Sequence, residues 1–415
     1  MDNKKKNSAS LADKLKLLGV KVGAKELARS KAIKHVPIDR VLQGNFRQTR
    51  FGESFVYEQR FSIKDLHGKI SLRPIPIPVI LAEYVKDSRI SELPIEKFIF
   101  FDTETSGLSG GTGTYAFMVG AGRYVGDEFI LAQFFLRDPA EEPAMLEALA
   151  DFFAEGEVLV SYNGKSFDAP LLETRYKLHS ILLPFAKYAH IDLLHLARRL
   201  WRNRLASRTL QSIEKEILGV TRTADEVPGY EIPYLYFDYL RDKDARTMKG
   251  IFYHNEMDIL SLVALLNHAG MMLNDPFSER VEESLDIIAI AKLFEELNKW
   301  DDAAHLYEYG LSGELPEEDF RRAVKRLSIL QRRRGDIDEA VKWWERAAGD
   351  GQIYACVELA KHYEHRVKDY DLAEDATHRA LSLMNESKNP QARTLWLDEL
   401  AHRLRRLERK IAVSG

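Results

Sequence analysis

The stretch Lys97-Phe-Ile-Phe-Phe-Asp-Thr-Glu-Thr105 decides the fold, because it joins a buried strand to a pair of acidic side chains. Its four apolar residues, 98–101, form a continuous run between a charged residue and a glycine-rich segment, which predicts a fully buried strand. Side chains two residues apart in a strand point to the same face. We therefore expect Asp102 and Glu104 to project together from the end of this strand.

Two adjacent carboxylates of this kind repel each other unless a positive charge compensates them. Carboxylate oxygens suit Mg²⁺ or Mn²⁺, so the pair is a candidate metal site. Taken alone, an Asp-x-Glu sequence is more often a solvated pair at a strand end, without function. The choice between these interpretations depends on what the rest of the chain adds.

Composition limits the class of protein. The chain has 415 residues, of which 45% are hydrophobic and 30% charged, as in a globular protein of two or three domains. Its net charge of −4 gives no whole-chain attraction to nucleic acid or anionic membranes, although residues 1–60 and 198–222 are locally basic. The single cysteine, Cys356, excludes an intramolecular disulfide and a cysteine-based zinc site. With no apolar stretch of membrane-spanning length and no signal-type core, we expect a cytoplasmic protein and no membrane partner.

Two segments precede the central strand. Residues 1–44 are lysine-rich and are expected to form a basic, flexible arm. Residues 45–96 form a lead-in, in which the alternation of apolar and polar residues around Gly52 predicts a β-hairpin. Prolines at positions 74, 76 and 78 then predict an extended stretch that cannot be a central strand.

The elements after the central strand alternate between strands and helices. Apolar patterns predict strands over 116–125, 128–136 and 158–163, and a helix over 141–154. The central strand and the strands over 116–125 and 128–136 follow each other in succession, which predicts an antiparallel meander. Asp168 comes after a turn at Gly164 and begins a helix, where its ordinary role would be to cap the helix.

Later segments add polar and aromatic candidates. A helix over 248–271 places His254 and Asp258 four residues apart on one face, although such a pair is usually a surface hydrogen bond. Residues 193–219 are predicted to be helical and basic, and arginines such as Arg204 near a tryptophan suit phosphates and unstacked bases. In the aromatic segment 231–240, Tyr234 or Tyr236 is a candidate for lining a substrate groove, and core packing is the alternative.

Four acidic residues now stand in chain order on these elements. The motifs Asp102-x-Glu104, Asn163-x-x-x-Phe167-Asp168 and His254-x-x-x-Asp258 resemble those of the ribonuclease H-like fold, specifically the DEDD exonuclease superfamily. The longer words 101–115 (Phe-Asp-Thr-Glu-Thr-Ser-Gly-Leu-Ser-Gly-Gly-Thr-Gly-Thr-Tyr) and 253–258 (Tyr-His-Asn-Glu-Met-Asp) resemble the YprB-like subfamily. The resemblance covers about residues 45–270. It implies an α/β fold, a mixed sheet flanked by helices, with the exonuclease domain over 97–275.

The resemblance also implies a chemistry, which is two-metal-ion hydrolysis of phosphodiester bonds. Asp102, Glu104, Asp168 and Asp258 are the implied ligands of two divalent cations, Mg²⁺ or Mn²⁺, held roughly 3.5–4 Å apart. The implied substrate is a nucleic acid, DNA or RNA, attacked at a single-stranded 3′ end.

The third motif departs from the family in the position of its general base. DEDD exonucleases usually place Tyr four residues before the last Asp or His five residues before it. Here His254 stands four residues before Asp258 and Tyr253 five. His254 shares the helical face of Asp258 and is the preferred base, with Tyr253 in reserve. Six further positions are candidates for binding substrate: Thr103, Gly107, Leu108, Asn163, Arg204 and Tyr234.

The last third of the chain is repetitive and helical. Three words align without gaps, at 300–304 (Trp-Asp-Asp-Ala-Ala), 337–341 (Ile-Asp-Glu-Ala-Val) and 370–374 (Tyr-Asp-Leu-Ala-Glu). Their spacing is close to the 34 residues of tetratricopeptide repeats, so we expect an all-α, tetratricopeptide-like domain over 283–412. Such arrays bind peptides or proteins in a concave groove, and a helical buttress without a partner is the alternative.

These patterns support one leading hypothesis and one rival. The leading hypothesis is a metal-dependent 3′→5′ exonuclease with a helical accessory domain. The rival, motivated by the exchanged positions of Tyr253 and His254, is a nucleic-acid-binding adaptor. In that case the ribonuclease H-like domain would be weak or inactive and the repeats would recruit a protein.

Overall fold

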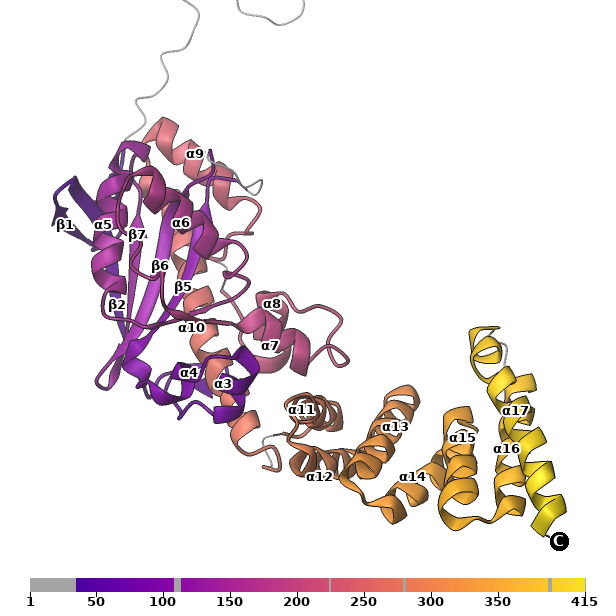
Figure 1. The fold of residues 1–415 in the computed structure, drawn as a ribbon. Coiled ribbons are helices and arrows are strands. Elements are labelled where there is room, and N and C mark those ends of the chain that lie inside the picture. The colour runs from indigo at the N-terminus through magenta and orange to yellow at the C-terminus, as the bar shows by residue number, and fades with distance from the viewer. Residues whose placement is uncertain (1–34, 108–112, 224, 279–280, 387–389, 415) are drawn as a thin grey trace, which may run out of the picture.

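The computed structural model describes residues 35–107, 113–223, 225–278, 281–386 and 390–414. Figure 1 shows an α/β domain, from which an array of helices extends on one side. Of the predicted basic arm, residues 1–34 lie outside the described residues, and so does the substrate candidate Leu108.

A seven-stranded mixed sheet forms the centre of the α/β domain, in the order β1-β2-β7-β6-β5-β8-β9. Its strands are β1 (Asn45–Thr49), β2 (Gly52–Ser62), β5 (Phe98–Thr105), β6 (Ala116–Val125), β7 (Glu128–Phe135), β8 (Val158–Ser161) and β9 (Ala189–Asp192). β5 pairs antiparallel with β6 and parallel with β8. The predicted meander and the α/β fold with a mixed sheet are therefore confirmed.

The hairpin predicted around Gly52 belongs to this same sheet. β2 pairs with β7 over eight positions, from Phe55 opposite Phe135 to Ser62 opposite Glu128. Part of the segment expected to be a lead-in thus extends the sheet at the edge away from β8. Two short strands, β3 (Leu66–His67) and β4 (Ile70–Ser71), form a separate small sheet.

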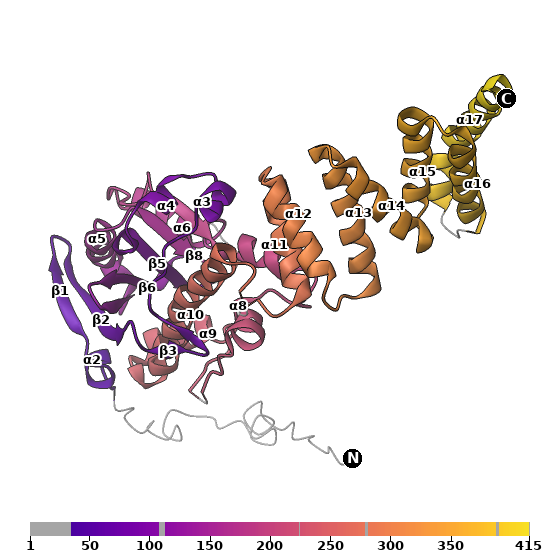
Figure 2. The ribbon, with the colours of Figure 1, turned by 90° about the horizontal axis from the view of Figure 1, so that it is seen from below.

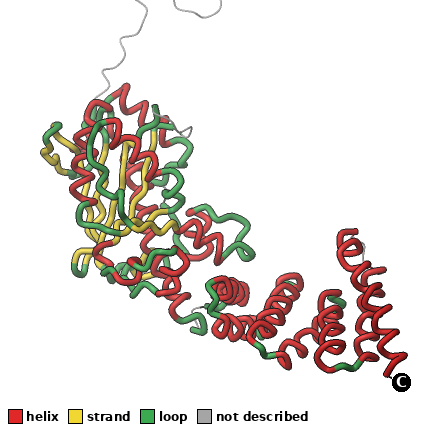
Figure 3. The backbone as a smooth tube through the Cα atoms, viewed as in Figure 1, coloured by secondary structure: helices red, strands yellow, loops and turns green. Residues whose placement is uncertain are grey.

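Helices cover both faces of the sheet, as Figures 1 and 3 show. They are α2 (Ile38–Val41), α3 (Val79–Val85), α4 (Arg89–Glu92), η1 (Ile95–Lys97), η2 (Pro139–Glu141), α5 (Glu142–Phe153), α6 (Asp168–Leu178), α7 (Leu193–Leu200), α8 (Leu210–Ile213), η3 (Glu214–Leu218), α9 (Ile232–Asp242), η4 (Ala245–Thr247) and α10 (Met248–Asn274). Alternate β5 residues join different cores. Phe98 and Phe100 pack with α10, whereas Ile99 and Phe101 pack with α5 and α6.

The prediction that residues 193–219 are helical is only partly right. α7 ends at Leu200, and the described residues 201–209 contain no helix. The chain becomes helical again because the side chain of Thr209 accepts a hydrogen bond from the amide of Ser212 and so caps α8. A π-helical turn, η3, follows and ends at Gly219, which has a φ of 67°.

α10 is the central helix of the domain. Within the described residues it belongs to one stretch, Ala245–Asn274, that is long and apolar enough to cross a membrane by length and composition. However, 78% of its most apolar 18-residue window is buried within the fold. Its apolar surface is explained by contacts with β5, β6 and β7 on the sheet.

The C-terminal part consists of helices arranged in neighbouring pairs, visible in Figure 2. They are α11 (Ser284–Glu296), α12 (Trp300–Leu311), α13 (Glu317–Arg334), α14 (Ile337–Gly349), α15 (Ile353–His362), η5 (Tyr363–Val367), α16 (Tyr370–Glu386) and α17 (Pro390–Ser414). α12, α14 and α16 begin at the first residues of the three repeated words. Ala303, Ala340 and Ala373 are fully buried, which lets the paired helices approach closely. The all-α region is confirmed, and its likeness to tetratricopeptide repeats stays a prediction.

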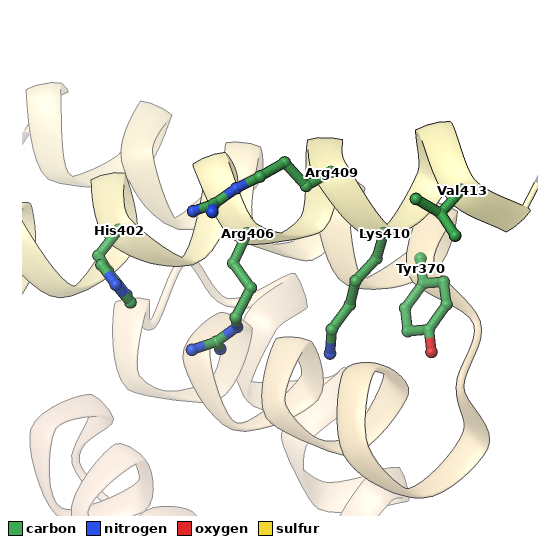
Figure 4. Close-up of a pocket in the computed structure, with 6 residues that line it drawn as sticks. All are labelled: Tyr370, His402, Arg406, Arg409, Lys410 and Val413. Atoms are coloured by element: carbon green, nitrogen blue, oxygen red, sulfur yellow. The ribbon is translucent and has the colours of Figure 1, made fainter.

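A cavity of about 430 Å³ lies beside α17 at the far end of this array. Figure 4 shows the side chains that line it, which are Tyr370, His402, Arg406, Arg409, Lys410 and Val413. Four of the six are basic and none is acidic. This cavity contains no residue of the sequence motifs that suggested a nuclease.

Candidate metal centre

Asp102 and Glu104 lie on the face of β5 that is turned towards α10. Both have the same parity along the strand as Phe98 and Phe100, which pack with that helix. Asp102 is opposite Gly120 of β6. A Cβ atom at Gly120 would lie 2.1 Å from Oδ1 of Asn255 on α10, so only glycine lets the helix approach here. The predicted common orientation of the two carboxylates is confirmed.

Asp168 reaches the same place from the next strand. β5 and β8 are parallel, so their carboxyl ends lie at one edge of the sheet, and α6 begins at Asp168 shortly after β8. The hydroxyl of Thr103 donates a hydrogen bond to Oδ1 of Asp168. A Cβ atom at Gly164 would lie 3.0 Å from Oδ2 of Asp168, so glycine makes room for the carboxylate. Asp168 is the first residue of the helix, and the preceding residue, Phe167, is its N-cap.

α10 supplies the third part of the site. Nε2 of His254 lies 3.3 Å from Oδ2 of Asp258 and 4.0 Å from Oε1 of Glu104. Ligand atoms of Glu104, His254 and Asp258 all lie within 4.8 Å of one another, a separation at which one cation can contact all three. Asn255 donates from Nδ2 to Oδ2 of Asp102 at 3.2 Å, which ties β5 to the same helix. We call Asp102, Glu104, Asp168 and Asp258 the acidic cluster.

The acidic cluster has more negative charge than the protein neutralises. Burial, followed by repulsion from Asp258, Asp168 and Glu104, holds the pKa of Asp102 well above its usual range. Burial also raises the pKa of Glu104 to about 8 and that of Asp168 to about 6. These carboxylates therefore favour a proton or a cation beside them.

One buried oxygen of the acidic cluster lacks a hydrogen bond. Oε1 of Glu104 is buried and has no hydrogen-bond partner among the described residues. A buried, unpaired carboxylate oxygen is costly unless a cation approaches it. The carboxylate oxygens form a donor set that suits Mg²⁺ or Mn²⁺, so the residues fit the divalent metals expected of the fold.

The pKa values of His254 and Asp258 are shifted in opposite directions. Burial lowers the pKa of His254, but the hydrogen bond and charge of Asp258 and the charge of Glu104 outweigh it, raising that pKa to about 10. Burial raises the pKa of Asp258, but His254 and Arg222 outweigh it and lower that pKa. The neighbouring carboxylates thus favour the protonated form of His254.

Arg222 and Glu226 are site residues that the sequence interpretation missed. Nη2 of Arg222 donates to Oδ1 of Asp258, and its Nη1 donates to Oε1 of Glu226 at 2.8 Å. Nδ1 of His254 lies 2.8 Å from the same Oε1 of Glu226. Both residues lie between η3 and α9, outside any regular element. Arg222 belongs to the basic segment noticed in the sequence, but nothing there indicated a buried partner.

The two candidates for the base are oriented differently. His254 faces Asp258 and Glu104, as described above. The hydroxyl of Tyr253 accepts a hydrogen bond from the amide of Thr223 at 2.9 Å. Tyr253 is therefore tied to the loop that carries Arg222.

The substrate candidates are dispersed. The amide of Asn163, whose φ is 66°, donates to Oδ1 of Asp192 at 2.8 Å, and Asp192 also caps α7. The carbonyl of Gly107 accepts from the hydroxyl of Thr105 at 3.0 Å.

Tyr234 and Arg204 differ in their surroundings. Tyr234 is 71% exposed on α9, whereas Tyr236 is buried and stacks on Phe117 with ring centroids 4.0 Å apart, so Tyr236 lines no groove. Nη1 of Arg204 lies 2.5 Å from Oδ2 of Asp286 on α11. The structure thus places Arg204 at the junction between the α/β domain and the helical array.

Comparisons with known proteins agree with this geometry. The family described as the RNase_H superfamily matches residues 99–270, the segment that contains the whole acidic cluster. The uncharacterized protein YprB of Bacillus subtilis (strain 168) is 36% identical over 290 residues, which cover 68% of this chain and 68% of YprB.

A solved structure, the family B DNA polymerase of the archaeon Pyrobaculum calidifontis, matches with a TM-score of 0.33 and 18% identity. That match covers 52% of this chain and 29% of the polymerase, and no assignment rests on it. The chain belongs to the same family as YprB, and its residues 99–270 form a domain of the ribonuclease H superfamily.

Proposed function

We propose that this protein is a metal-dependent 3′→5′ exonuclease that hydrolyses phosphodiester bonds at single-stranded ends of DNA or RNA. The observation that carries the proposal is the excess of buried carboxylates, in which Oε1 of Glu104 has no hydrogen-bond partner among the described residues. Such an arrangement is unfavourable unless positive charge binds.

The residues that would hold the cations are Asp102, Glu104, Asp168 and Asp258. When two Mg²⁺ or Mn²⁺ ions are bound, they would activate a water molecule, stabilise charge on the scissile phosphate and oppose protonation of His254. Thr103 and Asn255 orient two of the carboxylates through their hydrogen bonds to Asp168 and Asp102.

His254 is the proposed base. Its Nδ1 faces the carboxylate of Glu226, so a proton on Nδ1 is retained there and Nε2 becomes the acceptor. Nε2 points to the acidic cluster, where the attacking water must be held. Tyr253, whose hydroxyl is engaged by Thr223, is the weaker candidate for this role.

An exposed aromatic surface beside His254 supports a single-stranded substrate. Tyr230 and Tyr234 are each 71% exposed and stand four residues apart. The neighbouring Gly229 approaches the ring of His254, since a Cβ atom on this glycine would lie 3.9 Å from Cε1. Exposed aromatic rings stack on unpaired bases with little sequence preference. We propose that Thr103, Gly107 and Asn163 contact the terminal nucleotide, and we leave Arg204 out of this site because Asp286 engages it.

End-labelled oligonucleotides test the proposal. Purified protein is incubated with 5′-labelled and 3′-labelled single strands of DNA and RNA, in Mn²⁺ or in EDTA. We expect a ladder of shortened products from the 5′-labelled strand and early release of label from the 3′-labelled strand, in Mn²⁺ only. Equal inactivity of wild type and of the Asp102→Ala/Glu104→Ala variant on every substrate would overturn the proposal.

A second candidate function rests on the cavity in Figure 4. Arg406 and Lys410 of its lining bind Glu364, but the three cations around that one carboxylate leave positive charge in excess, which would favour an acidic partner and suits an adaptor that recruits a protein through the helical array. In that case the acidic cluster would be dispensable. Full cellular function of an Asp258→Asn variant would favour the adaptor, and loss of function would favour the nuclease.

A further inference from the structure

Arg222 lies at the centre of a buried ionic network beside the acidic cluster. Its side chain is 8% exposed and contacts three carboxylates, those of Glu214, Glu226 and Asp258. No substrate or solvent contact is needed to explain this position. The role of Arg222 therefore depends on which of these three carboxylates it orients and which only neutralises its charge.

Arg222 is held in place mainly by Glu214. Nε and Nη2 of Arg222 donate to Oε2 and Oε1 of Glu214 at 2.8 and 2.6 Å, a two-point contact that fixes the plane of the guanidinium. Glu214 is itself 2% exposed and accepts a further hydrogen bond from the hydroxyl of Ser261 on α10, at 2.7 Å. That hydroxyl lies 2.8 Å from Nε2 of the buried His67. Arg222 is thus anchored from the side away from the acidic cluster.

The remaining contacts of Arg222 point towards the site. Nη2 also donates to Oδ1 of Asp258, while Oδ2 of the same carboxylate faces His254. Nη1 contacts Glu226, the carboxylate that faces Nδ1 of His254. One fixed guanidinium therefore sets the orientation of Asp258 directly and that of His254 through Glu226.

Neutralisation of Glu214 alone does not explain this arrangement. A two-point contact already pairs one arginine with one buried glutamate. The contacts with Asp258 and Glu226 are additional, and they connect to the two residues of α10 on which metal binding and proton transfer are proposed to depend. Partners of this kind orient metal ligands, and their loss typically weakens metal binding 10–100-fold.

We propose that Arg222 is a positioning residue of the metal centre: anchored on Glu214, it holds Asp258 in the orientation that binds a divalent cation and, through Glu226, it orients His254, the proposed base. This inference rests on the metal centre of the proposed nuclease and deepens it. It assigns a role to a residue that touches neither substrate nor cation. Arg222 thereby extends the site from the sheet edge and α10 to the loop between η3 and α9.

The test compares metal affinity with folding in two variants. Arg222→Gln leaves Glu214 buried without its partner, so both stability and affinity for Mn²⁺ should fall. Arg222→Gln/Glu214→Gln removes both charges of this pair, so its melting temperature should lie above that of Arg222→Gln. We expect its affinity for Mn²⁺, measured by calorimetric titration of the full chain, to remain 10–100-fold weaker.

A matched control separates this effect from the loss of any buried ion pair. Arg175 and Glu142 form a buried pair between α5 and α6, outside the acidic cluster. Arg175→Gln/Glu142→Gln should bind Mn²⁺ like wild type. If Arg222→Gln/Glu214→Gln also binds Mn²⁺ with wild-type affinity, Arg222 only neutralises Glu214 and the proposal is overturned.

Cleavage assays distinguish this proposal from the proposed function. For Arg222→Gln/Glu214→Gln we expect the KM for an oligonucleotide to be unchanged and kcat to recover when Mn²⁺ is raised 10–100-fold. If wild type binds Mn²⁺ and cuts no nucleic acid, the nuclease proposal fails, whereas the affinity difference between the variants still supports the role of Arg222.

Discussion

Two groups of buried charges, one in each part of the molecule, have opposite balances. In the acidic cluster of the α/β domain, four carboxylates face His254 and Arg222, and burial with mutual repulsion raises the pKa of Glu104 to about 8. In the helical array, the buried Glu364 accepts hydrogen bonds from three cations, those of Arg403, Arg406 and Lys410. We call these four residues the Glu364 cluster.

The two groups differ in whether their carboxylates are paired: Glu364 has enough cationic partners, whereas the acidic cluster has too few. Although burial raises the pKa of Glu364, its hydrogen bonds with Arg406 and Lys410 outweigh this effect and lower the pKa to about 2. The carboxylate of Glu364 is thus fully paired, although the three cations outnumber it, and these contacts connect η5 to α17. In the acidic cluster, compensation is incomplete and Oε1 of Glu104 has no hydrogen-bond partner among the described residues. Burial alone therefore does not identify a functional carboxylate. An excess of buried negative charge over positive charge does.

The largest effect is expected for the substitution Asp258→Asn. It removes a proposed metal ligand and the partner of both His254 and Arg222, so cleavage of a labelled oligonucleotide in Mn²⁺ should fall about 10³-fold, or roughly 4 kcal/mol. Circular dichroism should show that the helices are retained. Cleavage within tenfold of wild type would contradict the assignment of Asp258 as a ligand.

The substitution Glu364→Gln should mainly affect stability. It leaves three cations close together without their counter-charge, at a cost of about 3 kcal/mol in the free energy of unfolding. Because the pKa of Glu364 lies below the usual 4.5, its contribution is present above pH 4.5 and is lost as the pH falls towards 2. Urea unfolding at several pH values measures this, with cleavage activity as the control that should not change. A stability gap that stays constant down to pH 2 would show that the carboxylate charge is irrelevant.

The substitution Glu104→Gln should act in the opposite direction. In EDTA it removes a buried charge that lacks compensation, so we expect the fold to gain about 1–2 kcal/mol. The raised pKa of Glu104 means that the metal-free wild type loses stability as the pH rises from 4.5 to 8, and the variant escapes this loss. Melting curves in EDTA at pH 5 and pH 8 measure the difference. Saturating Mn²⁺ should reverse the order, because only wild type binds it fully. If Glu104→Gln is less stable than wild type in EDTA at pH 8, the acidic cluster does not carry an excess of negative charge.

The smallest effect is expected for Arg204→Ala, at the junction of the two parts. Arg204 forms ion pairs with Glu283 and with the buried Asp286 of the helical array, so its loss should lower the free energy of unfolding. Since its guanidinium is engaged there, the affinity for an oligonucleotide, measured by fluorescence anisotropy in EDTA, should change less than twofold. A larger loss of affinity would show that Arg204 contacts the nucleic acid, as the sequence suggested.

Local patterns were enough to predict the strand and the carboxylates of the site. The apolar run before Asp102 and the two-residue spacing to Glu104 depend on neighbouring residues alone, and both follow the geometry of a single strand. The first residues of α12, α14 and α16 are also set by local sequence, because each repeated five-residue motif lies at the N-terminus of one helix. Parallel pairing of β5 and β8 then brings Asp168 to the same sheet edge.

Contacts made by loops could not be predicted in this way. Arg222 is 36 residues from Asp258 and lies in a segment without periodicity, so its partner depends on how the loop after η3 folds back onto α10. Arg204 meets Asp286 across 82 residues, and its basic neighbourhood suggested nucleic acid instead. Sequence patterns indicated which residues carry charge, but the fold decides which charges compensate each other.

Anomalous diffraction from crystals of the full chain soaked in Mn²⁺ tests the central claim most directly. We expect Mn²⁺ in contact with Asp102, Glu104, Asp168 and Asp258 in wild type, with Oε1 of Glu104 among its ligands, and weaker occupancy in Asp258→Asn. Absence of Mn²⁺ from the acidic cluster at a saturating concentration would contradict the account, because the excess of buried negative charge would then be compensated by protons alone.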